Sequence, residues 1–157
     1  MPPIPVKPGP YKFYAHIIGP PALLTAREHA IDHGLPTVTD RPLPHPLDTL
    51  HQEWTIEPLE RGLPGSPYVI YLGAYAEEET QNRTGLIVVD HKVYANTVPR
   101  DQLTKFIFEP GLGGLQIVDD KDHLALRAGH LGQQIEAVTP NKADPHQVWT
   151  LHSPIGL

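Results

Sequence analysis

Beyond residue 35, short apolar or alternating runs are separated by segments rich in Gly, Pro, Asn and Asp. Runs of four to eight residues bounded by such turn-forming residues are typical of β-strands. The pattern therefore predicts an all-β domain. The predicted strands cover residues 12–17, 36–40, 53–58, 68–73, 85–90, 92–98, 105–110, 115–120, 123–128, 133–138 and 148–153.

Residues 20–36 carry a different local signal. The segment has two prolines at its start, an apolar stripe that runs from Leu23 to Ile31, and Gly34 at its end. These are the start, face and stop of a short amphipathic helix. On local evidence alone, the segment is predicted to be helical, with Arg27 on its polar side.

A similar phrase closes three successive stretches of the chain. It reads QEWTIEP at residues 52–58, TKFIFEP at residues 104–110 and QVWTLH at residues 147–152. A spacing of about 40 to 50 residues indicates an internal repeat. In each phrase an aromatic residue is followed two positions later by Ile, Phe or Leu, so both side chains lie on one face of a strand, which we expect to face the core.

Three units of about four strands account for the repeat and require a twelfth strand in the first unit. Residues 22–28 are the remaining place for it, which changes the helix interpretation of this segment to a strand followed by a loop. The units cover residues 10–60, 61–111 and 112–157, and together they form a single predicted domain, 1–157.

Composition narrows the classes of partner. The chain has 157 residues, a formal net charge of -6, 19 Pro, 13 Gly and no Cys. The acidic balance and the lack of a basic run argue against binding of nucleic acid, and the missing thiols exclude disulfides and thiolate metal sites. With no apolar run of membrane-spanning length and no signal peptide, we expect a monomeric cytoplasmic protein without membrane partners.

Catalytic and metal chemistry find little support in the sequence. The serines are Ser66 and Ser153, and neither lies in a G-x-S-x-G elbow. His29 and His33 would converge on a metal ion only if their segment were helical. We therefore expect a protein that is not an enzyme and that holds neither a metal nor a cofactor.

The three units resemble the β-trefoil, in which six strands close a barrel and three hairpins cap one end. The Gln-x-Trp phrase of that fold is matched at 52–54 and 147–149, whereas the middle unit departs from it with Thr104 and Phe106. Among trefoils, this small, cysteine-free, Pro-rich chain is similar to the serine protease inhibitors of mushrooms, which are associated with fungal defence.

The resemblance implies inhibition of trypsin-like serine proteases, with Arg27 on the loop between the second and third strands as the primary specificity residue. A trypsin-like pocket has a carboxylate at its base, with which a guanidinium forms a bidentate, charge-assisted pair. Inhibition rather than cleavage requires a loop held rigidly in its bound shape. Thr25, Ala26, Glu28 and His29 are predicted to flank Arg27 in the protease cleft.

Other loops of the same fold give alternative inhibitors. Lys142 lies on the Pro-bracketed segment 139–145 and is a second candidate cation. Related mushroom trefoils inhibit papain-like cysteine proteases through loops at the unit edges. Others inhibit asparagine-specific proteases through an Asn between the fifth and sixth strands, where this chain has Asn82.

A carbohydrate-binding lectin is the alternative from a different class. The Gln-x-Trp phrase is shared with ricin-type sugar-binding trefoils, but its Trp belongs to the core, so the phrase indicates the fold rather than a sugar. A sugar site needs an exposed aromatic ring beside an Asp or Asn. Asp119, Asp120 and Tyr94 are the candidates for such a site.

Overall fold

Twelve β-strands form where the sequence alternates or runs apolar. The computed structural model describes residues 4–17, 19–27, 33–43, 51–60, 67–73 and 82–153. The strands are β1 Gly9–Ala15, β2 Leu23–Ala26, β3 Leu35–Asp40, β4 Trp54–Pro58, β5 Tyr68–Leu72, β6 Asn82–Val89, β7 Lys92–Pro99, β8 Phe106–Gly111, β9 Gly114–Asp119, β10 Ala125–Arg127, β11 Glu136–Val138 and β12 Trp149–His152. Two 3-10 helices lie between them, η2 Arg100–Gln102 and η3 Pro145–Gln147.

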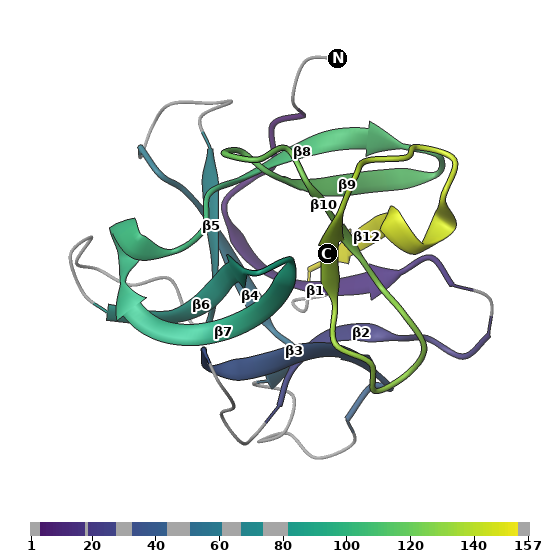
Figure 1. Ribbon diagram of the computed structural model, residues 1–157, viewed down its shortest axis with the longest axis horizontal. Coiled ribbons are helices and arrows are strands. Elements are labelled where there is room, and N and C mark those ends of the chain that lie inside the picture. Colours follow the sequence, from purple (N-terminus) through teal and green to yellow (C-terminus); the bar gives the residue numbers. More distant parts are fainter. Residues whose placement is uncertain are drawn as a thin grey trace.

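Six of these strands close a barrel (Figure 1). Antiparallel pairs link β1 to β4, β4 to β5, β5 to β8, β8 to β9, β9 to β12, and β12 back to β1. Each of the three sequence units supplies two neighbouring members of the ring. A closed ring leaves no unpaired sheet edge, which removes the risk of edge-to-edge association.

The other six strands form three hairpins, β2–β3, β6–β7 and β10–β11. The hairpins also pair with one another. Leu35 of β3 lies opposite Ala95 of β7, Glu136 of β11 lies opposite Lys92 of β7, and Val38 forms an isolated bridge with Gln134. The three hairpins are therefore hydrogen-bonded to one another as well as within themselves.

The repeated phrase supplies much of the core, as the alternation predicts, although Leu151 in the third phrase is only partly buried against it. Trp54, Phe106 and Trp149 are fully buried, and so are the residues two positions after the first two of them. The two indoles are also hydrogen-bonded. Trp54 Nε1 donates to the carbonyl of Leu24 at 2.9 Å, and Trp149 Nε1 donates to the carbonyl of Leu126 at 3.1 Å. Each indole thus ties a barrel strand to the hairpin of its own unit.

The middle unit achieves the same tie without an indole. Phe106 has no N–H, and the carbonyl of Leu86 in β6 instead accepts the backbone N–H of Thr104 at 3.1 Å. The hydroxyl of Thr104 accepts the backbone N–H of Val88 at 2.9 Å. The hairpin of the middle unit is therefore still hydrogen-bonded to the barrel, although this unit lacks Gln-x-Trp.

Residues 23–26 are extended as β2, and all four are buried. The helical signal of this segment is overridden because β2 pairs with β3 over four residues, from Leu23 opposite Asp40 to Ala26 opposite Thr37. Burial on both faces explains why an apolar stripe was misleading here. Residues 28–32 lie outside the described part of the chain.

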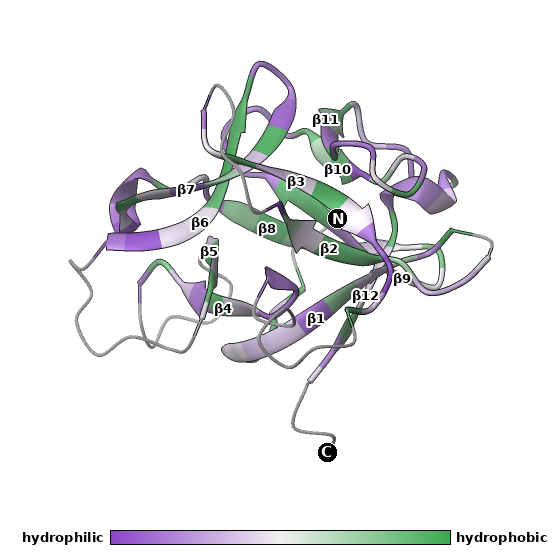
Figure 2. Ribbon diagram, turned by 90° about the horizontal axis from the view of Figure 1, so that it is seen from below, coloured by the Kyte–Doolittle hydropathy of each residue, from purple (hydrophilic) through white to green (hydrophobic). Residues whose placement is uncertain are grey.

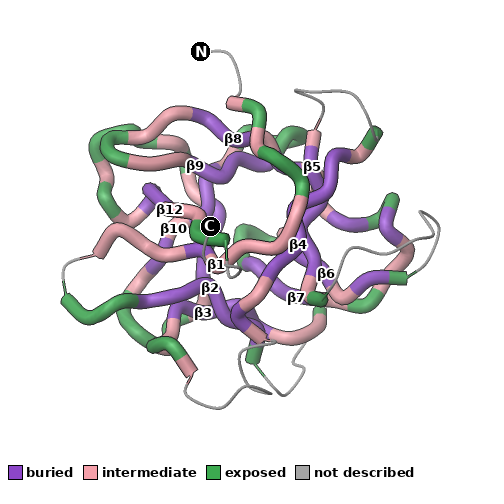
Figure 3. The backbone as a smooth tube through the Cα atoms, turned by 180° about the vertical axis from the view of Figure 1, so that it is seen from behind, coloured by how far each residue is buried: buried purple, intermediate pink, exposed green. Residues whose placement is uncertain are grey.

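Hydrophobic stretches concentrate in the strands and hydrophilic residues in the turns (Figure 2). The tube view shows the matching pattern, with buried strand segments inside and exposed turns at the periphery (Figure 3). Among the described residues, no helix has the length and hydrophobicity needed to cross a membrane.

Candidate functional site

Arg27 lies at the point where the β2–β3 hairpin opens into a loop. It follows the last residue of β2 directly, and its backbone N–H still donates to the carbonyl of Pro36 at 2.9 Å. Its side chain is exposed, whereas the four residues before it are buried. The backbone of Arg27 is therefore fixed by the sheet while its guanidinium reaches the surface.

The guanidinium of Arg27 is supported by the β10–β11 connection. Its Nη2 donates to the carbonyl of Gly132 at 2.9 Å. Gly132 is itself fixed, because its N–H donates to Thr39 in β3 at 2.8 Å, and Thr39 Oγ1 donates back to the carbonyl of His130 at 3.3 Å. Among the described residues, the partner of this cation is a neutral carbonyl, so its positive charge is not cancelled by a carboxylate.

The residues predicted to flank Arg27 are placed differently from one another. Thr25 and Ala26 are buried to 4% and 1% exposure and pair with Val38 and Thr37. Their prediction as cleft-lining residues needs correction, because β2 extends to Ala26 and a protease could enclose them only by unpairing the hairpin. Glu28 and His29 lie outside the described residues.

Thr25 has an internal role instead. Its hydroxyl accepts Nε2 of the buried Gln52 at 3.1 Å, and Gln52 Nε2 also donates to the carbonyl of Arg41 at 2.7 Å. The amide oxygen of Gln52 accepts the backbone N–H of Leu43 at 3.0 Å. The glutamine of the first Gln-x-Trp phrase thus holds the chain that leaves β3 and joins it to β2.

Gln147 holds the second candidate loop in the same way. This β11–β12 loop, residues 139–148, contains the exposed Lys142. Gln147 is 3% exposed; its Oε1 accepts the backbone N–H of Asn141 at 2.7 Å and its Nε2 donates to the carbonyl of Thr139 at 3.1 Å. The glutamine that marks the fold in the sequence therefore fixes the base of a surface loop, a role the motif alone does not reveal.

Asp144 holds the far side of the Lys142 loop. One carboxylate oxygen accepts the backbone N–H of His146 at 3.0 Å and the other accepts Nε of Arg127 at 3.0 Å. Burial alone would raise the pKa of Asp144, but the hydrogen bonds from His146 and Arg127 outweigh it and hold this pKa below its ordinary value of 3.8.

Asp144→Asn should therefore lower stability at neutral pH but not in acid. A carboxyl with a lower pKa in the folded chain stabilises it above the unfolded pKa, and loses this effect as the pH falls through the folded pKa. Because Arg127 is partly exposed, we expect a loss of about 0.5 to 1 kcal/mol at pH 7. Urea unfolding of the wild type and of Asp144→Asn at pH values from 7 down to about 2 measures this loss of stability. A difference in stability that does not shrink in acid contradicts the role of the charged Asp144 carboxylate.

Asn82 is the first residue of β6 and is exposed, opposite Pro99 in β7. The segment before it, residues 74–81, lies outside the described residues, so the predicted asparagine-presenting loop remains a prediction. The next residue, Arg83, is buried with its guanidinium over the ring of Tyr71, 5.4 Å from the ring centroid. Arg83, although basic and next to Asn82, is therefore buried within β6 and does not extend to the surface.

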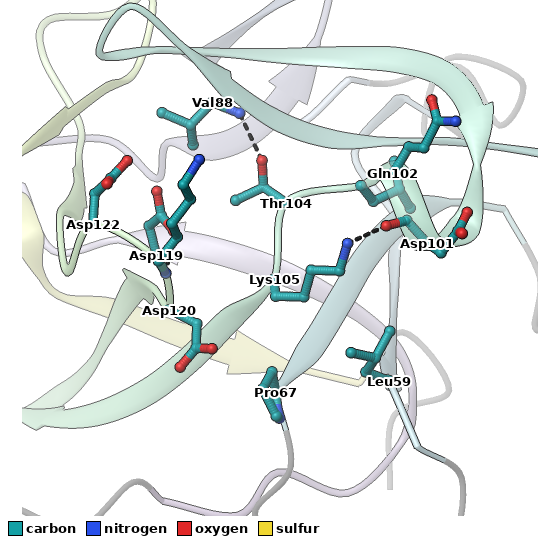
Figure 4. Close-up of a pocket in the computed structure, with 12 residues that line it drawn as sticks. Leu59, Pro67, Val88, Asp101, Gln102, Thr104, Lys105, Asp119, Asp120 and Asp122 are labelled. Carbon is teal, nitrogen blue, oxygen red and sulfur yellow. Dashed lines mark hydrogen bonds between the residues drawn. The ribbon is translucent and has the colours of Figure 1, made fainter.

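The residues of the lectin hypothesis do not come together. Asp119 and Asp120 line an open pocket of about 580 Å³ between η2, the start of β8 and the β9–β10 turn (Figure 4). Its described lining is polar and aliphatic, without an aromatic ring. Tyr94 is buried and packs edge-on against His33, with ring centroids 5.5 Å apart.

One carboxylate of this pocket also has a structural role. Asp119 is buried, and its Oδ1 accepts the backbone N–H of Lys121 at 2.8 Å, which closes the turn after β9. Figure 4 shows Lys105 extending toward Asp101, whose carbonyl accepts its ammonium. Within the described ranges, no group of three or more His, Asp or Glu side chains could hold a metal ion.

Arg100 is a residue whose place the sequence does not indicate. It lies in η2, is 5% exposed, and its Nε donates to the buried carboxylate of Glu57. Its Nη2 donates to the carbonyls of Pro58 and Leu59 at 2.7 and 2.6 Å. This guanidinium joins the second unit to the end of β4 and is not offered to a partner.

Solved structures share this arrangement of strands. Cry35Ab1 is similar with a TM-score of 0.65 at 19% identity, over 95% of this chain and 36% of that one, so the chain spans little more than a third of its length. A proteinase inhibitor from Coprinopsis cinerea is similar with a TM-score of 0.59 at 15% identity, over 94% and 99% of the two chains. The Rhizoctonia solani agglutinin is similar with a TM-score of 0.63 at 13% identity, over 95% and 97%.

These likenesses show the fold alone. No protein-family model matches the sequence, and no curated protein matches it either. The similar structures include a fungal inhibitor and a fungal agglutinin, both β-trefoil proteins, which agrees with the family resemblance at the level of fold. Neither is named for a catalytic activity.

Proposed function

We propose that this chain is a β-trefoil inhibitor of trypsin-like serine proteases, and that Arg27 enters the specificity pocket of the protease. The ring of six strands with three hairpins supports the trefoil assignment. The fold likeness to a fungal proteinase inhibitor supports the functional class. Recognition of the protease begins at Arg27 itself, since Thr25 and Ala26 belong to the sheet.

The observation that carries the proposal is an exposed arginine whose backbone is fixed. The N–H of Arg27 is bonded to Pro36, and its guanidinium rests on the carbonyl of Gly132. A contact residue whose backbone and side chain are already held loses little entropy on association, and low entropy loss distinguishes an inhibitor from a flexible substrate. The protease carboxylate replaces the neutral carbonyl as partner, and a charge-assisted bidentate pair is stronger than the bond it replaces.

Exposed apolar surface next to Arg27 favours a protein partner. Leu131, adjacent in sequence to Gly132, is 40% exposed. It lines an open pocket of about 440 Å³ together with Pro20, His130 and His146. An apolar contact beside a desolvated cation is typical of the centre of a protein interface.

Sugar binding is the second candidate, supported by the fold likeness to the Rhizoctonia solani agglutinin. The described pocket that contains Asp119 and Asp120 lacks the aromatic platform that a sugar ring needs, and the Asp119 carboxylate is engaged by the turn. These observations favour the inhibitor over the lectin.

Titration of trypsin with the purified protein tests the proposal. We expect residual trypsin activity to fall linearly as the protein is added, because protease and inhibitor pairs of standard interface size are among the tightest complexes. Elastase is the control, since its small specificity pocket does not admit arginine. Unchanged trypsin activity at micromolar protein refutes the proposal, and specific binding to a glycan array in the same preparation selects the lectin.

A further inference from the structure

A second exposed cation lies where the β8–β9 turn meets the β11–β12 loop. Figure 1 shows the tip of the β8–β9 hairpin beside the yellow segment that precedes β12. Lys142 and Ala143 from the loop and Pro110, Gly111 and Leu112 from the hairpin line an open, largely apolar pocket of about 340 Å³. Two segments far apart in the sequence thus form one surface.

Leu112 makes this surface unusual. It is 77% exposed, more than any other large hydrophobic side chain among the described residues. It lies at the turn between β8 and β9, which is among the exposed segments in Figure 3. A single exposed leucine needs no explanation by itself, but here it lies next to a cation on a rigid loop.

The Lys142 loop is fixed on both sides of its tip. Asn141 receives two constraints, since its N–H is bonded to the buried Gln147 and its Oδ1 accepts the backbone N–H of Ala143 at 3.0 Å. The N–H of Asp144 donates to the carbonyl of Asn141 at 3.1 Å, which closes the turn around Lys142. Its backbone therefore has little freedom left to lose on binding.

The charges around the loop leave Lys142 available. The one carboxylate of the loop, Asp144, is already paired with Arg127 at 3.0 Å. Lys142 is exposed and forms neither an ion pair nor a side-chain hydrogen bond with another described residue. The loop therefore presents an uncompensated ammonium group beside an apolar contact surface.

The glutamine that holds the loop does not by itself indicate a function. Gln52 binds the chain after β3 in the first unit with the same pair of bonds, so this device belongs to the fold. What the third unit adds is the combination of Lys142, Ala143 and the exposed Leu112. This combination of an exposed cation and exposed apolar residues is suited to binding a protein partner.

We propose that Lys142 is a second protease-binding site, which inserts its ammonium into the carboxylate-based pocket of a trypsin-like serine protease while Leu112 and Ala143 pack against the rim of the cleft. The choice of partner rests on the proposed function. Charge complementarity favours it, because a lysine on a rigid loop is the cation that such a pocket accepts besides arginine. The site is independent of Arg27, which is supported by Gly132 rather than by Gln147.

Trypsin inhibition by four chains tests the second site: wild type, Arg27→Glu, Lys142→Glu, and the double variant. Lys121→Glu, which reverses an exposed lysine in the β9–β10 turn, is the matched control. We expect each single variant to remain an inhibitor and the double variant to lose at least about a thousandfold in affinity. Loss of all inhibition in Arg27→Glu overturns the second site and leaves the proposed function standing, whereas a wild type that does not inhibit overturns the function.

Leu112→Ala separates recognition from loop structure. Combined with Arg27→Glu, it should weaken trypsin binding by about tenfold, because an apolar contact at the interface is lost. Combined with Lys142→Glu, it should change nothing, since binding then occurs at Arg27. An equal effect in both backgrounds, or none in either, contradicts the assignment of Leu112 to the second site.

Discussion

Arg27→Glu should weaken trypsin binding at the β2–β3 loop by at least about a thousandfold. The effect is measured in a chain that also carries Lys142→Glu, so that binding at Lys142 does not contribute. The substitution replaces a cation by an anion opposite the protease carboxylate. Breaking a buried, hydrogen-bonded charge pair typically costs about 2 to 5 kcal/mol, and the introduced repulsion adds to this loss.

The fold should not change, because Arg27 follows β2 and its backbone N–H, which the substitution keeps, is what pairs with Pro36. Arg27→Lys is the matched control, with a loss of about tenfold through the missing bidentate geometry. The inhibition constant is the readout, and unfolding in urea verifies the fold. Equal inhibition by the glutamate and arginine chains shows that Arg27 is not the primary contact.

Arg100→Met should destabilise the chain by about 3 to 5 kcal/mol, the largest stability effect that we expect from one polar side chain here. The change leaves the buried Glu57 carboxylate without the guanidinium and removes the donor to the carbonyls of Pro58 and Leu59. Losing one partner of a buried ion pair is more damaging than replacing both, because the remaining charge stays desolvated.

The double variant Glu57→Met with Arg100→Met is the control for this mechanism. It should be more stable than Arg100→Met alone, although not equal to wild type, since two backbone carbonyls still lack their donor. Unfolding in urea measures the free energy of unfolding of Arg100→Met and of the double variant. A loss below about 1 kcal/mol in Arg100→Met, or a double variant that is no better, contradicts the role of the pair.

The strands could be predicted because their determinants are local. Alternation and turn residues placed the barrel strands, and the repeated aromatic phrase identified Trp54, Phe106 and Trp149 as core. Strand boundaries were predicted wrongly where pairing extends beyond the apolar run. β6 begins at Asn82, three residues before its apolar run, because the ladder with β7 extends to Pro99.

The candidate sites were predicted less well, for a related reason. Local pattern does not reveal that Thr25 and Ala26 are buried, because their burial depends on pairing with β3 and, for Thr25, on Gln52, 27 residues later in the chain. Arg100 looks like an ordinary loop cation until Glu57, 43 residues earlier, is found beside it. Lys142 could be proposed from its prolines, but the pocket that it lines together with Leu112 depends on how the β8–β9 turn meets the β11–β12 loop.

The inward-pointing amides of Gln52 and Gln147 have a consequence for the variation that this chain can tolerate. Each amide holds backbone atoms of an outgoing segment from the protein interior, and in the third unit these bonds involve neither the Lys142 nor the Ala143 side chain. We therefore expect that Lys142 and Ala143 can be exchanged for other side chains without a change in the backbone of the loop. In the proposed inhibitor, the residues that determine the shape of this loop are therefore separate from those that select a target, and we expect that its specificity can be changed by substituting these two residues.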